Sequence, residues 1–109
     1  MIEPSKKLLS CIFNNNVTFL VLEDTEIWYK TECGIDANIS IYELMHKIKQ
    51  WAFSEGYAMK VDIIGKADWC IEIEYMHDGN NCYAKCFYNK NEFEAVVIAA
   101  EYILNKDNK

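Results

Sequence analysis

The sequence predicts a single α+β domain over residues 1–109, in which two main helices pack on an antiparallel sheet of about five strands. Capping signals precede two amphipathic segments, and runs of alternating apolar and polar residues precede and separate them. An Asp-Gly pair between two such runs is typical of a tight hairpin turn. The chain is half apolar and long enough for one core. We expect the order x-β-β-α-β-β-β-α, where x is residues 4–13, which fit either a short helix or a strand.

The first expected hairpin has strands over residues 17–22 and 26–31, joined by Glu23-Asp24-Thr25. It belongs to an acidic stretch, residues 22–36, in which carboxylates are interleaved with aromatic residues. Such a surface can dock into a basic groove, because aromatic anchors supply affinity and charges steer the encounter. The alternative is a solvated acidic hairpin that keeps the chain soluble. The candidate partner-binding residues here are Glu23, Asp24, Glu26, Trp28, Tyr29, Glu32 and Asp36.

A helix is expected over residues 40–55, because Ser40 and Glu43 form a capping box and Gly56 stands where a C-terminal cap belongs. Its main apolar face consists of Ile41, Leu44, Met45, Ile48, Trp51 and Ala52. A second stripe on this helix consists of Tyr42, His46, Lys49 and Phe53. Two interpretations of the stripe stay open. Either the N-terminal segment packs over it, or Tyr42, His46 and Phe53 are further partner-binding residues.

Three strands are expected next, over residues 57–64, 68–76 and 81–88. A type I′ turn at Asp78-Gly79 would pair His77 with Asn80 and fix the register of the last two strands. The pairs that follow are Tyr75 with Cys82, Ile73 with Ala84, Ile71 with Cys86 and Trp69 with Tyr88. In the first strand, Met59, Val61 and Ile63 would face Ile73, Ile71 and Trp69. On the opposite face we expect a row of alternating charge formed by Lys60, Glu72 and Lys85.

The cysteines of this region raise the question of a metal or thiol site. In the expected register Cys82 and Cys86 point into the core. Cys70 points the opposite way, and His77 lies at the turn. Groups on two faces of a sheet cannot converge on a tetrahedral metal, so we expect no metal site and no cofactor. Buried cysteines that act as small apolar residues explain this cluster better.

The last helix is expected over residues 91–105, with Asn91 as its N-cap and Glu94 three residues later. A broad apolar arc covers one side of it, and Ala95, Ile98 and Tyr102 extend the apolar surface around the other side. A helix this apolar is buried on two sides or meets a partner. The candidate residues for self-association into a homodimer are therefore Ala95, Ile98 and Tyr102.

Composition and charge narrow the classes of function. The formal net charge is −6 and all eleven basic residues are lysine, which disfavours direct binding of nucleic acid or of an anionic membrane. The absence of arginine fits the codon bias of an AT-rich genome equally well. There is no phosphate-binding loop, nucleophile elbow or zinc-protease motif, so we expect no catalytic residue and no enzyme activity. An odd number of cysteines, with neither a leader nor a membrane-spanning stretch, favours free thiols in the cytoplasm.

Two helical segments, SIYELMHKIKQWAFSEGY and NEFEAVVIAAEYILNK, carry a resemblance to known proteins. The matching residues are Trp51, Ala52, Gly56, Tyr57, Glu94, Ala95, Ala99, Glu101, Tyr102, Ile103 and Leu104. The chain resembles small acidic accessory proteins encoded by phages and prophages of AT-rich bacteria. The resemblance implies a setting in which such proteins inhibit host defence by binding an effector, as anti-CRISPR proteins do.

The leading functional hypothesis is a non-enzymatic acidic inhibitor that binds a basic nucleic-acid-handling effector, such as a nuclease or CRISPR component, and blocks its substrate path. Toxin-neutralising immunity proteins are similar in size and charge and form one alternative. A homo-oligomeric assembly module that uses the last helix is the other.

Overall fold

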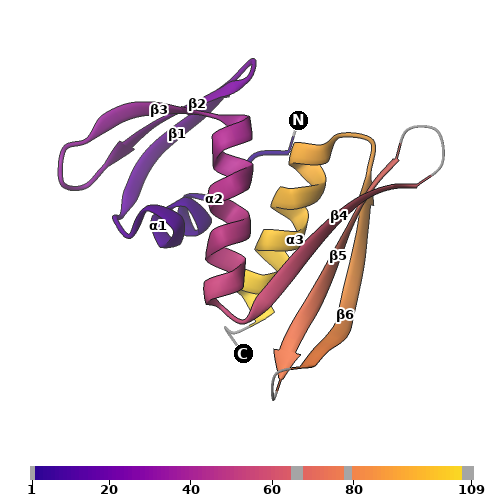
Figure 1. The fold of residues 1–109 in the computed structure, drawn as a ribbon. Helices are drawn as coiled ribbons and strands as arrows, with labels where there is room; N and C mark the ends of the chain where they lie inside the picture. The colour runs from indigo at the N-terminus through magenta and orange to yellow at the C-terminus, as the bar shows by residue number, and fades with distance from the viewer. Residues whose placement is uncertain (1, 65–67, 78–79, 107–109) are drawn as a thin grey trace.

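The computed structural model describes residues 2–64, 68–77 and 80–106. Over this part of the chain it contains three helices and two separate antiparallel sheets of three strands each (Figure 1). The first sheet has the order β1-β2-β3 and the second the order β4-β5-β6. The elements in chain order are α1 (Lys6–Phe13), β1 (Val17–Glu23), β2 (Glu26–Thr31), β3 (Asp36–Ser40), α2 (Ile41–Ser54), β4 (Tyr57–Ile64), β5 (Asp68–His77), β6 (Asn80–Asn89) and α3 (Glu92–Lys106).

The expected architecture, one sheet of about five strands with two helices, is therefore wrong, although the structure is α+β. The ambiguous N-terminal segment is the helix α1, which begins because the Ser5 hydroxyl accepts a hydrogen bond from the Leu8 backbone N–H at 3.0 Å. The additional strand is β3, which the sequence pattern does not reveal. It contains Asp36 and Asn38, both poor strand formers, and only its Ile39 is buried.

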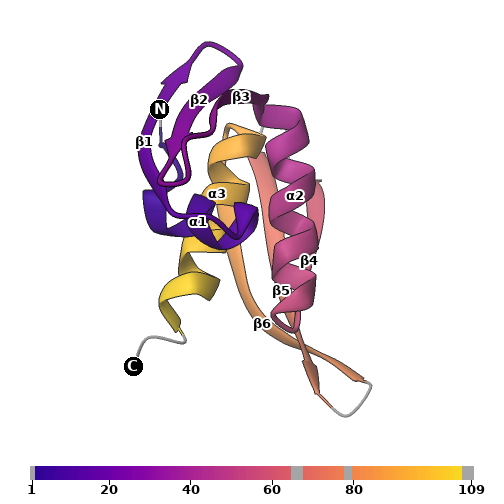
Figure 2. The same ribbon diagram turned by 90° about the vertical axis from the view of Figure 1, so that its left-hand side faces the viewer.

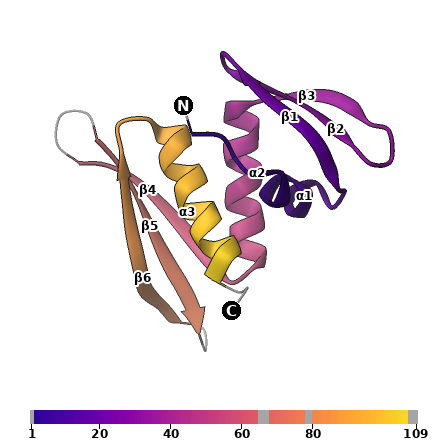
Figure 3. The ribbon, with the colours of Figure 1, turned by 180° about the vertical axis from the view of Figure 1, so that it is seen from behind.

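The helix α2 separates the two sheets. It begins directly at the end of β3, where the Ser40 hydroxyl accepts the Glu43 N–H at 3.1 Å, as the capping signal predicts. Its 14 residues run about 21 Å before the chain enters β4. Figures 1 and 3 show α2 and α3 side by side between the two sheets. Strands of the two sheets therefore face opposite sides of a helical layer and do not pair with one another.

The helix α3 is apolar nearly all round because other parts of the chain cover it on two sides. It packs on β5 and β6 along one side and on α2 and α1 along the other. The N-terminal segment is fastened to it by Glu101, whose carboxylate accepts the Ser5 N–H at 2.7 Å and the Ser5 hydroxyl at 3.0 Å. Figure 2 shows α1 beneath the first sheet, where Leu8 and Leu9 are fully buried.

The register of the second sheet confirms part of the prediction and corrects the rest. The pairing of β4 with β5 is as expected, and so are the pairs His77–Asn80 and Tyr75–Cys82. A bulge follows between Ile73 and Glu74, where residue 84 of β6 is the additional residue. The turn at residues 78–79 lies outside the described residues.

The bulge exchanges the two faces of β6 beyond that point, because a slip of one residue turns every later side chain over. Ile71 faces Phe87 and not Cys86, so Phe87 packs inward against Tyr102 with ring centroids 5.4 Å apart. The larger apolar side chain takes the place that the prediction gave to a cysteine. Of the expected row of Lys60, Glu72 and Lys85, the first two are opposite one another as predicted, whereas the bulge places Lys85 opposite Ile73. The Lys60 ammonium forms its ion pair with Glu74 at 2.7 Å, and Lys85 lies over the rings of Phe87 and Tyr102.

Candidate functional site

The outer face of the first sheet carries exposed aromatic side chains. The middle strand β2 turns Ile27 and Thr31 inward, where they are buried, and turns Trp28 outward, where it is 42% exposed. Trp28 lies between Val21 of β1 and Asn38 of β3. Beside this trio Phe19 is 48% exposed, with the Lys30 ammonium 5.7 Å from its ring centroid. We call this surface, Phe19, Val21, Trp28 and Asn38, the aromatic face.

The acidic turn of the β1–β2 hairpin lies at one end of this face. Glu23 and Glu26 are directly opposite one another across the turn, and Asp24 between them has φ 56°. Like charges directly opposite one another destabilise a hairpin, so this placement of two carboxylates lowers the stability of the fold. At the other end of the face Asp36 is opposite Lys30, an ordinary complementary pair.

Two of the predicted partner-binding residues lie elsewhere. Tyr29 points inward and stacks on Phe13 of α1, with ring centroids 4.6 Å apart and planes 15° apart. Glu32 follows β2 in the chain and accepts a hydrogen bond from the Asn16 amide at 2.9 Å, which holds the loop against the end of α1. The structure thus brings Glu23, Asp24, Glu26, Trp28 and Asp36 to the outer side of the sheet and leaves Tyr29 and Glu32 with local structural contacts.

The second stripe of α2 is open to solvent. Tyr42 is 66% and Phe53 62% exposed, and His46 between them is exposed as well. The interpretation in which the N-terminal segment covers this stripe is therefore wrong. The carbonyl of Thr25 accepts the Ile41 N–H at 2.9 Å, which ties the acidic turn to the first residue of α2. Tyr42, the next residue, consequently lies beside that turn.

The candidate self-association residues of α3 are largely covered by the chain itself. Ala95 is fully buried, while Ile98 and Tyr102 are partly buried. The Tyr102 ring packs against Phe87, and Lys85 lies 4.9 Å from its centroid. Self-association through this helix stays a prediction, and Ala95 has no surface to offer to a second copy.

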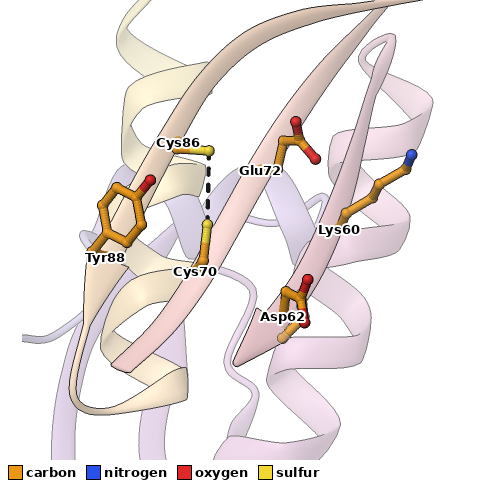
Figure 4. Close-up of a pocket in the computed structure, with 7 residues that line it drawn as sticks. Lys60, Asp62, Cys70, Glu72, Cys86 and Tyr88 are labelled. Atoms are coloured by element: carbon orange, nitrogen blue, oxygen red, sulfur yellow. Dashed lines mark hydrogen bonds between the residues drawn. The ribbon is translucent and has the colours of Figure 1, made fainter. Parts of the chain in front are cut away.

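The outer face of the second sheet holds a different constellation, a pair of thiols in an open hollow (Figure 4). The Cys70 thiol donates a hydrogen bond to the Cys86 sulfur at 3.7 Å. Burial raises the pKa of the Cys70 thiol, and its hydrogen bond with Cys86 raises that pKa further. Hydrogen bonding with Cys86 raises the pKa of the Tyr88 hydroxyl. The hollow measures about 610 Å³ and is lined by Lys60, Val61, Asp62, Cys70, Glu72, Cys86 and Tyr88.

This arrangement corrects the prediction for the cysteines. Cys86 lies on the outer face beside Cys70, and Cys82 is exposed, so neither points into the core. Cys70 does point to the outer face as expected, yet it is buried there. His77 pairs with Asn80 at the far end of the strands, away from this pair. Within the described ranges no group of three or more His, Cys, Asp or Glu side chains suits a metal ion.

A third thiol, Cys33, has its own polar surroundings in the loop after β2. The Thr31 hydroxyl lies 3.4 Å from its sulfur, and the Asn15 amide donates to that sulfur at 2.7 Å. These two hydrogen bonds, that of Thr31 first, lower the pKa of the Cys33 thiol. An exposed thiol with a lowered pKa is more nucleophilic near neutral pH than an ordinary one.

Sequence reasoning missed Phe19 and the Cys70–Cys86 contact for the same physical reason. A bulge between Val17 and Phe19 turns Phe19 outward, where strict alternation from the buried Val17 would have turned it inward. The bulge at residues 73–74 similarly moves Cys86 to the outer face. Neither bulge has a glycine or a proline nearby to signal it.

The comparisons with known proteins give no match to a family model, a curated protein or a solved structure. Among the residues that the structure describes, no helix has both the length and the apolar character needed to cross a membrane.

Proposed function

We propose that the chain is a non-enzymatic binding protein that occupies a basic surface of a nucleic-acid-handling protein and so inhibits it. The observation that carries this proposal is the outer side of the first sheet, where exposed Trp28 lies between the acidic turn at one end and exposed Phe19 toward the other. Tryptophan is the residue most often found at the energetic centre of protein interfaces. Carboxylates at its edge would steer the approach of a basic partner and fix its orientation.

Charge argues for a protein partner with a positive surface. A net charge of −6 repels nucleic acids and anionic membranes and attracts the grooves in which basic proteins hold nucleic acid. The like-charge pair of Glu23 and Glu26 supports the same conclusion. The two carboxylates repel one another in the free protein and destabilise it, and a positive group of a partner beside them would remove this repulsion. Tyr42, His46 and Phe53 of α2 would extend the contact from the acidic turn along the helix.

The resemblance to phage-encoded accessory proteins supports an anti-defence setting of the anti-CRISPR type, with the inhibitor acting in the host cytoplasm. A toxin with a basic groove would fit the same surface, as expected for an immunity protein. The two roles differ only in the identity of the effector, so one experiment addresses both.

The test compares a hairpin variant with a control variant of equal charge. The hairpin variant is Glu23→Lys, Asp24→Asn and Glu26→Lys, and asparagine is used at position 24 because it tolerates the observed positive φ. The control variant is Glu3→Lys, Asp62→Asn and Asp68→Lys, three exposed acidic residues outside the hairpin. Both variants change the net charge by the same amount, so only the position of the charge differs.

Each tagged protein is incubated at low salt with a lysate of the cells that produce it, and bound material is released with a DNA duplex at constant ionic strength. We expect the wild type and the control variant to retain a basic protein that the duplex releases. We expect the hairpin variant and Trp28→Ala to lose it. Equal retention by the hairpin variant, or a bound protein that the duplex does not release, would overturn the proposal. Recovery of the chain alone would favour self-assembly instead.

A further inference from the structure

We propose that Cys70 and Cys86 form a thiol-oxidation site, which closes reversibly to a disulfide by exchange with a small disulfide such as glutathione disulfide. This inference does not rest on the proposed function. It concerns the second sheet, on the opposite side of the helical layer from the aromatic face (Figure 1).

The geometry of the sheet brings the two sulfurs together. Cys70 is opposite Tyr88 and Cys86 is opposite Glu72, so the two cysteines are diagonal neighbours on paired antiparallel strands. Their sulfurs are 3.7 Å apart and share a hydrogen bond. A disulfide needs about 2.05 Å between the sulfurs. Diagonal neighbours on paired strands are typically about 7–8 Å apart, beyond the Cα separation usual for a disulfide, so closure takes rotation of both side chains together with a small movement of the strands.

The two thiols differ in access, which assigns them different roles. Cys70 is only 4% exposed, whereas Cys86 is partly exposed in the open hollow (Figure 4). A small disulfide can therefore reach Cys86 and not Cys70. Cys86 is the thiol that reacts first, and Cys70 is the resolving thiol beneath it. Tyr88 lines the same hollow as the two thiols (Figure 4).

The exchange takes place in two steps, each an attack of a thiolate on a disulfide. Cys86, once deprotonated, attacks one sulfur of glutathione disulfide. The glutathione S–S bond breaks, one glutathione leaves and takes up a proton, and a mixed disulfide forms on Cys86. Cys70 then loses its proton and attacks the Cys86 sulfur, which releases the second glutathione. In sum, two protein thiols are oxidised to one disulfide and one glutathione disulfide is reduced to two thiols.

The test uses a two-thiol variant in which the three exposed cysteines are replaced, Cys11→Ser, Cys33→Ser and Cys82→Ser. The folded variant is equilibrated with graded ratios of reduced to oxidised glutathione, quenched with acid and alkylated with N-ethylmaleimide. Intact mass then reports the state of Cys70 and Cys86. We expect a species lighter by two hydrogens that carries no alkyl group and no glutathione, and that returns to the dithiol at reducing ratios.

Two single substitutions in this background test the roles of the thiols. Cys70→Ser should stop at a mixed disulfide with one glutathione on Cys86, because no resolving thiol is present. Cys86→Ser should react with glutathione disulfide at no more than about a tenth of the rate of Cys70→Ser, because the remaining thiol is buried. Oxidation should also raise Tm, since the disulfide links two strands across the turn.

Several outcomes would overturn the proposal. In the first, the two-thiol variant takes up two alkyl groups at every glutathione ratio, so no disulfide forms. In the second, it keeps a bound glutathione and never forms the disulfide between Cys70 and Cys86. In the third, Cys86→Ser reacts as fast as Cys70→Ser. Peptide mapping of the unsubstituted chain after the same treatment removes any dependence on how the variants fold. A peptide pair joined through Cys70 and Cys86 is expected there, and its absence would contradict the assignment.

Discussion

The two sheets of this protein have the same number of strands in the same order of connection, but their outer faces differ. On the outer face of the second sheet, Lys60 pairs with Glu74 at 2.7 Å and the Cys70 thiol bonds to Cys86, while the other Glu74 oxygen is buried without a hydrogen-bond partner among the described residues and Tyr88 is 60% exposed. In the first sheet, Trp28 is exposed at the centre and Glu23 opposes Glu26 at one end. The first sheet thus differs by a like-charge pair beside an exposed tryptophan, and on this difference we base the proposed partner surface.

The inner faces, by contrast, are equivalent. Ile27 of β2 and Ile71 of β5 are both fully buried on the middle strands of their sheets, and both belong to one continuous core. Because the helical layer contacts both sheets, each sheet should depend on the other for stability.

The largest expected effect comes from removing either of these side chains. Ile27→Ala and Ile71→Ala should each lower the free energy of unfolding by about 2–5 kcal/mol, since both leave a cavity in a close-packed core. Denaturant unfolding followed by circular dichroism and by tryptophan fluorescence measures this change. We expect one transition with both probes in each variant. Two resolved transitions, each shifted by only one substitution, would mean that the sheets are independent units.

A smaller effect is expected at the link that fastens the N-terminal segment to α3. Glu101→Ala removes the acceptor of both Ser5 hydrogen bonds and should lower the free energy of unfolding by roughly 1.5–3 kcal/mol. Glu94→Ala is the comparison, because it removes one longer and exposed bond of 3.3 Å to the Ile2 N–H and should cost less. Equal losses in the two variants would show that this link contributes nothing specific.

The thiols of the two sheets should differ in their response to pH. The pKa of Cys33, beside the first sheet, is lowered by hydrogen bonds, whereas the pKa of Cys70 in the second sheet is raised by burial. The thiolate is the reacting form, so iodoacetamide should label Cys33 at a lower pH than Cys70. Peptide mass spectrometry over a pH series measures these rates. Thr31→Val and Asn15→Ala should each move the labelling of Cys33 to higher pH, and an unchanged rate in both variants would contradict the assigned cause.

Local chemistry made much of this structure predictable. The N-caps at Ser40 and Asn91 form the expected bonds, at 3.1 Å to Glu43 and 3.0 Å to Glu94, and the β4–β5 register is as predicted. Capping and alternation are properties of a few neighbouring residues, which is why a sequence reveals them.

The parts that could not be predicted depend on contacts between distant residues. Strand β3 exists because Ile39 packs opposite Ile27, although its own residues disfavour a strand. The two bulges are fixed by which side chain best fills the core, Phe87 and not Cys86 in one case. The exposed Phe19 and the thiol pair both follow from those bulges, so neither part of the candidate sites could be found by alternation alone.

The central claim is that the carboxylates of the first sheet lower its stability and bind a partner. The most direct test of this claim is Glu26→Lys. The substitution replaces a like-charge pair with a complementary one opposite Glu23. Unfolding and partner retention are measured on the same preparation. The account predicts that the free energy of unfolding rises by about 0.2–1 kcal/mol while retention of the basic partner at low salt falls. Retention that stays unchanged or increases as stability rises would contradict the claim, and the acidic turn would then be a solvated loop.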